Sequence, residues 1–287
     1  MEYVKFGRTN AKVSKIAFGG AGAGIKGYLG DYDPSRKSDR EGVIKAMEKA
    51  FELGINYFDT AQSYGNGIGE SIFGEGLHNL PRKEIFLSSK ISSSNHVRAS
   101  VMESLERIGT DYLDLIQIHG GCYLKREQDM VLQEGGVLEE LEKLKAEGFV
   151  RAIGFTTEDN NEAVYAFIRS NRFDTMQIRY NLISQHPFYE PFPKYDKEPG
   201  SLNFAKQHNM GTCSMRTLTS GRFQKWISLV RPDDNYDYNE ALLQFNLSCP
   251  VLDVSIVGMR TVDEVVQNVK ICNNLDARVD FAKIYNE

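Results

Sequence analysis

The sequence predicts a single (β/α)8 TIM barrel spanning residues 1–287, an α/β fold whose bottom is closed by an N-terminal β-hairpin. Short apolar segments alternate with amphipathic segments of helical period, and this alternation occurs eight times along the chain. The short segments are apolar at consecutive positions, which is typical of parallel strands covered on both faces. No repeat, charge block or low-complexity segment indicates a second domain.

The residues before the first barrel strand, YVKFGRTNAKVSKI (residues 3–16), predict the β-hairpin. Its turn is expected at Thr9 and Asn10, because asparagine tolerates the left-handed backbone conformation. We expect the hairpin to cover the bottom of the barrel.

The first strand and helix pair is expected at residues 15–20 and 38–54. Ser38 and Glu41 have the spacing of a capping box at the start of this helix, and Gly54 is a natural stop. The other seven pairs are predicted at residues 57–61 with 69–80, 85–90 with 95–109, 113–119 with 135–148, 151–157 with 160–171, 175–181 with 201–209, 211–218 with 238–248, and 254–258 with 261–274. The longest irregular segment, residues 184–200, is rich in proline and aromatic residues and is expected to form an ordered loop over the top.

Composition and charge restrict the class of partner. The net charge of −5 and the pI of about 5.7 give no electrostatic reason to expect a nucleic acid or an anionic membrane as partner. No window reaches the roughly 18 apolar residues of a membrane span, and the four cysteines form no CxxC pair. We therefore expect a cytoplasmic protein with reduced thiols that acts on a small molecule, and nothing in the sequence specifies its oligomeric state.

Four chemically capable side chains follow three neighbouring strands of the predicted barrel. Asp59 ends the second strand, Tyr64 lies in the loop after it, Lys90 ends the third strand and His119 ends the fourth. Chemistry in such barrels sits at the carboxyl ends of the strands, so these side chains are expected to converge. Each alone also fits a structural role, such as a turn cap or a solvated charge. Together they favour an active site.

The expected chemistry of this group is proton transfer. Lys90 would pair with Asp59, and its ammonium would favour the phenolate of Tyr64 and lower the phenol pKa from about 10. Such a phenol is a usable proton donor, and His119 could orient a substrate carbonyl by donating a hydrogen bond.

The segments YFDTAQSYGNG, IFLSSK, LDLIQIHG, RAIGFTT, MQIRYNL and VGMRTVDEVVQNV occur in this order over almost the whole chain. This ordered set closely resembles the aldo-keto reductase superfamily. The resemblance implies a barrel that binds NADP(H) without a Rossmann domain and reduces carbonyls to alcohols. It also implies that Asp59, Tyr64, Lys90 and His119 are a catalytic tetrad with Tyr64 as general acid.

The same resemblance implies contacts to the cofactor. Gln177 matches the glutamine that holds the nicotinamide amide, and Thr156 and Thr157 stand where serine and asparagine usually share that task. Met215 replaces a tyrosine that stacks on the nicotinamide ring in many members, which leaves a softer thioether contact. Arg216 is expected to meet the pyrophosphate or to be an exposed cation, and Leu218 to give a main-chain contact or plain packing.

The last strand-to-helix turn has the features of a phosphate site. Gly258 and Arg260 precede a helix whose start carries a capping box of Thr261 and Glu264, and helix N-termini attract anions. An ordinary capped helix fits the turn equally well. The resemblance favours the adenosine phosphate, with Asn268 near adenine. Because Glu264 replaces a usual arginine, Arg260 must carry the NADP preference alone; NADP(H) is favoured and NAD(H) is possible.

The sequence therefore predicts an NADP(H)-dependent reductase of small aldehydes, ketones or sugars, acting on a carbonyl or, in reverse, an alcohol. The pocket wall is expected from residues 21–34, from residues 120–130 and from Phe188, Tyr189 and Phe192. A cofactor-binding regulatory subunit with little turnover is the alternative. A metal-dependent hydrolase using Asp59 and His119 is a third possibility, although the sequence has no HxH or HExxH motif, so no metal is expected.

Overall fold

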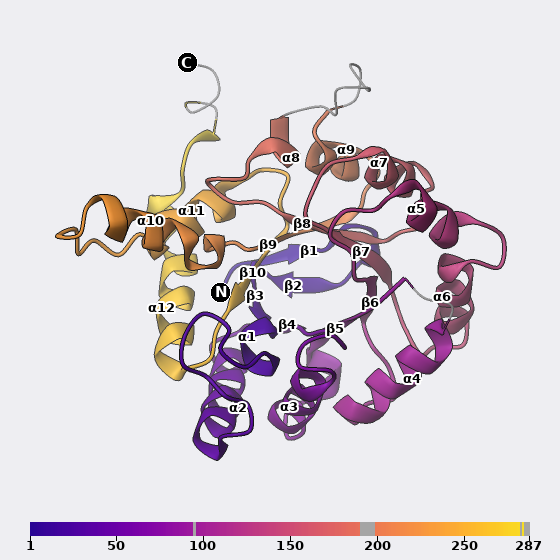
Figure 1. The fold of residues 1–287 in the computed structure, drawn as a ribbon, viewed down its shortest axis with the longest axis horizontal. Helices are drawn as coiled ribbons and strands as arrows, with labels where there is room; N and C mark the ends of the chain where they lie inside the picture. Colours follow the sequence, from indigo (N-terminus) through magenta and orange to yellow (C-terminus); the bar gives the residue numbers. More distant parts are fainter. Residues whose placement is uncertain (94–95, 190–198, 282, 284–287) are drawn as a thin grey trace.

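The protein, described here from a computed structural model, is a closed barrel of eight parallel strands inside a ring of helices (Figure 1). The structure describes residues 1–93, 96–189, 199–281 and 283. The barrel strands are β3 (Ile16–Gly19), β4 (Tyr57–Asp59), β5 (Phe86–Ile91), β6 (Leu115–Ile118), β7 (Ile153–Thr157), β8 (Thr175–Arg179), β9 (Gly211–Met215) and β10 (Val254–Gly258). Each strand pairs with its neighbour in the sequence, and β10 pairs with β3 to close the barrel. The predicted fold is confirmed.

A helix follows each strand and lies outside the barrel (Figure 1). The eight predicted helices are α2 (Lys37–Glu52), α3 (Ile68–Leu77), α4 (Val97–Ile108), α6 (Val137–Ala146), α7 (Glu162–Arg169), α9 (Ser201–Gln207), α11 (Asn239–Ser248) and α12 (Val262–Asn273). Helical segments that the sequence analysis did not predict are α1 (Ala21–Gly24), α5 (Lys125–Leu132), α8 (His186–Tyr189), α10 (Arg222–Val230), η1 (Gly7–Thr9), η2 (Arg82–Glu84), η3 (Thr219–Gly221) and η4 (Leu275–Ala277). Within the described ranges, no helix has the length and apolar character needed to cross a bilayer.

The strands bury both of their faces, as the consecutive apolar positions predict. Outward side chains such as Phe58, Leu87 and Ile116 belong to a large core under the helices. Inward side chains near the strand starts, among them Tyr57, Phe86 and Leu115, form a second core inside the barrel. Because side chains alternate along a strand, the inward positions two and four residues further on belong to the opposite, carboxyl end. Asp59 and Lys90 occupy such positions.

The N-terminal hairpin closes the barrel at the start of the strands, as expected. Its strands β1 (Tyr3–Lys5) and β2 (Lys12–Ser14) pair in antiparallel register and lie across the barrel end in Figure 1. Asn10 has the predicted left-handed conformation, with φ of 59°. The fully buried ring of Phe6 lies 5.7 Å from the Tyr57 ring and 5.6 Å from the Phe86 ring, centroid to centroid. A side chain at Gly211 would lie 2.7 Å from the Phe6 ring, so this glycine makes room for the plug.

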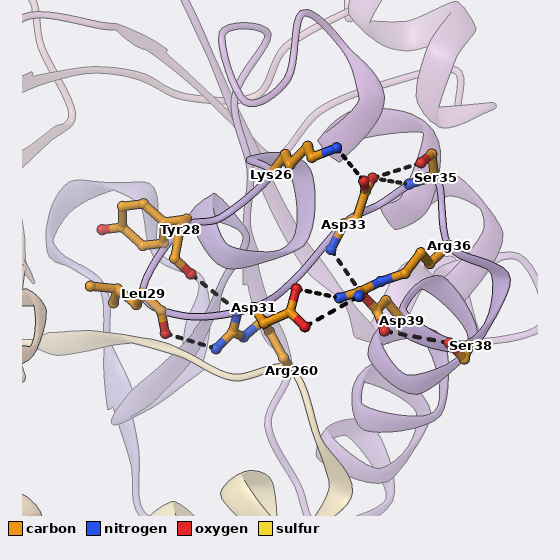
Figure 2. Close-up of polar contacts among 10 residues, drawn as sticks. All are labelled: Lys26, Tyr28, Leu29, Asp31, Asp33, Ser35, Arg36, Ser38, Asp39 and Arg260. Carbon is orange, nitrogen blue, oxygen red and sulfur yellow. Dashed lines mark hydrogen bonds and ion pairs between the residues drawn. The ribbon is translucent and has the colours of Figure 1, made fainter.

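The capping box predicted at Ser38 and Glu41 is wrong. Helix α2 begins at Lys37, and its N-cap residue Arg36 forms no side-chain cap. Asp39 serves the preceding loop, because its carboxylate accepts hydrogen bonds from the Asp33 main-chain nitrogen and from Arg36 Nε, both at 2.8 Å (Figure 2). Of the loop predicted at residues 184–200, residues 190–198 lie outside the described residues.

We predict that Phe6→Ala lowers the free energy of unfolding by about 3–5 kcal/mol, because it removes a fully buried ring and leaves a cavity that Gly211 cannot fill. Urea denaturation measures this loss. Trp226→Ala, at a side chain that is 50% exposed on α10, is the control and should cost less than about 1 kcal/mol. Equal losses in the two variants would show that the hairpin does not seal a packed core.

Candidate active site

A cavity of about 570 Å³ opens at the carboxyl ends of the barrel strands. Its wall includes Asp59 from β4, His119 just after β6 and Gln177 from β8, together with residues of the loops that follow β3, β4, β9 and β10. A second cavity of similar volume lies at the opposite end, beside Tyr3 and Lys12 of the hairpin, and contains none of the predicted site residues. The first cavity is therefore the candidate active site.

Asp59 and Lys90 form a buried ion pair at the base of this site. The distance from Lys90 Nζ to Asp59 Oδ2 is 2.6 Å, and both side chains are almost fully buried. Lys90 also donates to the main-chain oxygen of Thr60 at 2.7 Å, and Ser88 Oγ donates to Asp59 Oδ1 at 2.6 Å. A buried charge is tolerated only when it is paired and hydrogen-bonded, and both charges meet that condition here.

Tyr64 is the candidate proton donor, with its hydroxyl 3.5 Å from Lys90 Nζ. Burial raises the pKa of Tyr64 and outweighs the opposite effect of Lys90. The expectation of a lowered phenol pKa is therefore wrong. Burial also acts to lower the pKa of Lys90, but the attraction of Asp59 and Tyr64 outweighs it and the net pKa is raised. At neutral pH the site thus holds a neutral phenol next to an ammonium.

His119 stands across from Tyr64, with the two rings 5.8 Å apart and nearly perpendicular. Burial, reinforced by the charge of Lys90, lowers the pKa of His119 from 6.5 to about 4. The imidazole is therefore neutral at physiological pH. Ser63 Oγ lies 3.0 Å from Nδ1, which leaves Nε2 for a ligand in the cavity.

Most of the predicted cofactor residues line the same cavity as the candidate acid. These are Gln177, Met215, Arg216, Leu218, Gly258, Arg260 and Asn268. Thr156 and Thr157 are fully buried and do not belong to the wall. The Thr156 hydroxyl donates to the Gly120 carbonyl at 2.9 Å, and the Thr157 hydroxyl donates to the Asp159 carbonyl at 2.8 Å. Their role in holding a nicotinamide amide stays a prediction, and Gln177 is the member of this trio that reaches the cavity.

Arg216 is paired inside the protein, which the sequence analysis did not foresee. Its guanidinium contacts the carboxylate of Glu158, with Nη2 2.6 Å and Nε 2.8 Å from Oε1. Glu158 also lies 3.6 Å from Arg179 Nη1, so one carboxylate faces two cations at the cavity wall. Arg216 itself has a positive φ of 56°, which turns the chain sharply at the end of β9.

Arg260 fastens the loop after β3 to the opposite side of the cavity. Its Nη1 and Nη2 donate to the main-chain oxygens of Tyr28 and Leu29 at 3.1 and 3.3 Å (Figure 2). The guanidinium carbon also lies 5.3 Å from the centroid of the Tyr32 ring, within the range of a cation–π contact. Among the described residues, no carboxylate forms an ion pair with Arg260.

The capping box predicted at Thr261 and Glu264 is confirmed. Glu264 Oε2 accepts hydrogen bonds from the main-chain nitrogens of Arg260 and Thr261, at 2.6 and 3.2 Å, and Thr261 Oγ1 accepts from the Glu264 nitrogen. The carboxylate that replaces the expected arginine is thus occupied by the start of α12.

One expected part of the pocket wall, residues 120–130, differs from the prediction, and the part around Phe188 is tested only at that residue, which is not in the wall. Residues 21–34 contribute as expected through Ala21, Ile25 and Tyr28, but within the described part of the chain residues 120–130 contribute nothing to the wall. The ring of Phe188 packs against Phe281, and the Tyr189 side chain and Phe192 lie outside the described residues.

The sequence analysis missed three residues that support the predicted tetrad, Ser63, Ser88 and Gln117, and it missed Glu158, which pairs with Arg216. Gln117 is buried beside Asp59, with Nε2 3.4 Å from Asp59 Oδ1. Only their positions in the sequence could have indicated these residues. Ser63 directly precedes Tyr64, and Gln117 lies two residues before His119 in LDLIQIH. Over the described ranges, no group of three or more histidine, cysteine, aspartate or glutamate side chains is placed to hold a metal ion.

Comparison with known proteins agrees with this arrangement. An uncharacterized oxidoreductase of Bacillus subtilis, YqkF, is 25% identical over 270 residues, which cover 82% of this chain and 84% of the relative. A D-threo-aldose 1-dehydrogenase of a Pseudomonas species is 26% identical over 271 residues, covering 78% and 81% of the two chains.

The fold is shared with solved structures. An aldo/keto reductase from Klebsiella pneumoniae in complex with NADP and acetate superposes with a TM-score of 0.74 at 23% identity, over 99% of this chain and 93% of that one. Residues 15–284 match the model of the Aldo/keto reductase family, which spans nearly the whole chain. The barrel, the buried Asp59–Lys90 pair beside Tyr64 and this match together show that the chain belongs to the aldo/keto reductase family.

Proposed function

We propose that this protein is an NADP(H)-dependent oxidoreductase that reduces the carbonyl of a small aldehyde, ketone or sugar to an alcohol, with Tyr64 as general acid. The observation that carries the proposal is the placement of a neutral phenol and a neutral imidazole on one cavity wall, with the Lys90–Asp59 pair directly behind the phenol. Membership of an oxidoreductase family supports it, as does the NADP bound by the similar Klebsiella protein.

The wall of the cavity fits a nicotinamide dinucleotide. Gln177 offers an amide at the base of the cavity, and the guanidinium groups of Arg216 and Arg260 stand further along its wall. The N-terminus of α12 lies beside Arg260 and adds the positive end of its helix dipole, although its cap amides at Arg260, Thr261 and Glu264 are already bonded within the cap. A reduced nicotinamide bound at Gln177 would supply the hydride for the carbonyl carbon.

The proton for the carbonyl oxygen would come from Tyr64. As the phenol loses its proton, the Lys90 ammonium 3.5 Å away stabilises the phenolate, and Asp59 keeps Lys90 in place. Neutral His119 would donate a hydrogen bond from Nε2 to the same carbonyl oxygen in the tautomer in which Ser63 donates its hydroxyl proton to Nδ1. Both donors then act on the oxygen where negative charge develops in the transition state.

Preference for NADP over NAD would rest on Arg260. Glu264 is engaged by the cap of α12, where its carboxylate accepts from the main-chain nitrogens of Arg260 and Thr261. Arg260 is bonded to neutral carbonyls, so its charge is not cancelled by an acid and remains available to a 2′-phosphate. We also propose a cytoplasmic location, which suits four cysteines that are all free thiols.

An enzyme is favoured over the cofactor-binding regulatory subunit. A sensor that binds the dinucleotide needs the arginines and Gln177 but has no need of a phenol next to a buried ammonium, and this chain has both sets. The complete proton-donor arrangement therefore supports turnover.

We predict that Tyr64→Phe lowers kcat for reduction of an aldehyde by about 100-fold or more, since a general acid contributes about 10²–10⁴-fold. The affinity for NADPH should stay within about 3-fold, because the phenol is not needed to hold the cofactor. Stopped-flow absorbance measures the rate, and calorimetric titration measures the affinity.

The matched control is Tyr112→Phe, which removes a buried hydroxyl that has no hydrogen-bond partner among the described residues and lies away from the cavity. It should leave kcat unchanged. Full activity in Tyr64→Phe would exclude Tyr64 as the acid.

We predict that His119 makes the fold acid-sensitive. The pKa of His119 is about 4 in the folded protein and near 6.5 when unfolded, so as the pH falls below 6.5 the unfolded chain takes up this proton first. Stability contributed by the neutral imidazole is present above pH 6.5 and is lost toward pH 4, by about 3 kcal/mol. Urea denaturation of the wild type and His119→Gln at pH 7.5 and 4.5 measures the difference. The wild type should lose more stability on acidification than the variant, and parallel losses would contradict a buried neutral His119.

We predict that Arg260→Gln weakens NADP⁺ binding by about 10-fold or more and leaves NAD⁺ binding within about 3-fold, because the charge faces the 2′-phosphate alone. Calorimetric titration with both dinucleotides gives the ratio, which cancels any shared effect of loosening the loop at Tyr28 and Leu29. Arg222→Gln, at an exposed arginine of α10, is the control. An equal loss for both dinucleotides would assign Arg260 to loop anchoring only.

A further inference from the structure

The buried carboxamide of Gln117 connects Asp59, which belongs to the predicted tetrad, with Gln177, which is a predicted cofactor contact. It is fully buried on β6, and its Nε2 lies 2.9 Å from Gln177 Oε1 and 3.4 Å from Asp59 Oδ1. Asp59 belongs to β4 and Gln177 to β8, so this side chain bridges two strands that are not its neighbours in the barrel. Neither the expected tetrad nor the expected cofactor contacts include it.

The bridge exists because β7, the strand between Gln117 and Gln177, has a glycine at the matching position. Gln117 is in register with Gly154, and a side chain at Gly154 would clash with Thr175 Oγ1 and lie 3.2 Å from Gln117 Cγ. Without a side chain there, the Gln117 carboxamide passes across β7 and reaches Gln177. Gly154 therefore makes the contact possible.

The acceptor-only character of a carboxylate fixes the direction of both amides. Asp59 carries the charge that balances Lys90, so the Gln117 atom facing it must be the donor nitrogen. The same NH₂ group then requires an acceptor on Gln177, which turns the Gln177 oxygen toward Gln117. The remaining Gln177 nitrogen has no hydrogen-bond partner among the described residues, and Gln177 lines the cavity. Gln177 thus presents N–H donors to a ligand.

The two threonines near Gln177 do not offer a hydrogen-bond acceptor to a ligand in the cavity. The hydroxyls of Thr156 and Thr157 are fully buried outside the cavity wall, and their oxygens already accept from the main-chain nitrogens of Gly120 and Asp159. The part of the cavity around Gln177 therefore recognises an acceptor atom on the ligand.

We propose that Gln117 is a positioning residue that holds the Gln177 carboxamide with its NH₂ group toward the cavity, so that the site binds the carbonyl oxygen of the nicotinamide carboxamide rather than its amino group. The inference rests on the proposed function, in that it takes a nicotinamide as the ligand at Gln177. It adds the direction of the hydrogen bond and the residue that sets it.

The direction of this hydrogen bond can be read with a cofactor analogue. In the 3-acetylpyridine analogue of NADP⁺ the ring carries a methyl ketone, which keeps the carbonyl oxygen and lacks the amino group. Calorimetric titration of the wild-type protein should give dissociation constants for NADP⁺ and the analogue within about 3-fold of each other. An analogue that binds about 10-fold or more weakly would show that Gln177 presents its oxygen, since a buried acceptor would then lose its partner, and would overturn the proposal.

A double-mutant cycle tests whether Gln117 acts through Gln177. Gln117→Met keeps the length of the side chain and removes its donor, and it should weaken NADP⁺ binding by about 5-fold, the effect of one neutral hydrogen bond. In the background of Gln177→Met the same substitution should change the dissociation constant by less than about 2-fold, because the contact it supports is already gone. Equal losses in both backgrounds would overturn the proposal.

The matched control is Gln244→Met, which removes another buried carboxamide, bonded to the Ile271 and Asn274 carbonyls outside the cavity. It should alter stability without altering either dissociation constant. Wild-type protein that binds neither NADP⁺ nor the analogue would overturn the proposed function and this inference together. If the wild type binds NADP⁺ and the effects of Gln117→Met and Gln177→Met on the dissociation constant simply add, this inference alone is overturned. The comparison with the analogue uses only the wild-type protein, so it does not depend on the folding of any variant.

Discussion

The buried ion pair of Lys90 and Asp59 is the interaction on which the site depends. Two charges removed from water are costly, and their mutual attraction offsets this cost only when every remaining lone pair and N–H finds a partner. Ser88, the Thr60 carbonyl, Gln117 and the Tyr64 hydroxyl supply these partners. The polar layer at the carboxyl end of the barrel is therefore assembled around the pair, and the identity of each neighbour follows from the atom it must satisfy.

The same pair explains the protonation states around it. Tyr64 stays a neutral phenol because burial opposes a second anion near Asp59, although Lys90 pulls the other way. His119 stays neutral because burial and Lys90 both oppose a second cation. A proton donor and a neutral hydrogen-bond donor thus coexist next to one fixed ammonium. The protonation states of Tyr64, His119 and Lys90 are therefore set by the protein itself, without a ligand.

The barrel was predictable because its signal is local and repeated. Consecutive apolar residues indicate each strand, and apolar residues at helical spacing indicate each helix. The sequence therefore placed β5 and α4 within a few residues of their observed bounds. Asp59, Lys90 and His119 were predictable for the same reason, since the end of a strand fixes their location. The helix cap at Thr261 follows a local rule and is present, whereas Ser38 has the same spacing but Asp39 and the loop before it determine the start of α2.

Contacts between side chains far apart in the chain carry no such signal. The Glu158–Arg216 pair and the Gln117–Gln177 contact join residues about 60 positions apart, and only the closed barrel brings them together. The direction of the Tyr64 pKa depends on how deeply its oxygen lies in the protein, which a sequence pattern does not encode. Helix α10 was missed because it is an insertion with exposed apolar residues rather than a wall of the barrel.

The plug formed by Phe6 and the cavity lie at opposite ends of the barrel. The packed aromatic layer of Phe6, Tyr57 and Phe86 lies below the polar layer, on the side away from the cavity. Asp59, Tyr64 and His119 line the cavity at the carboxyl end, so the polar layer meets the cavity on that side. A ligand bound in the cavity would therefore cover the open side of the polar layer and reduce its contact with water.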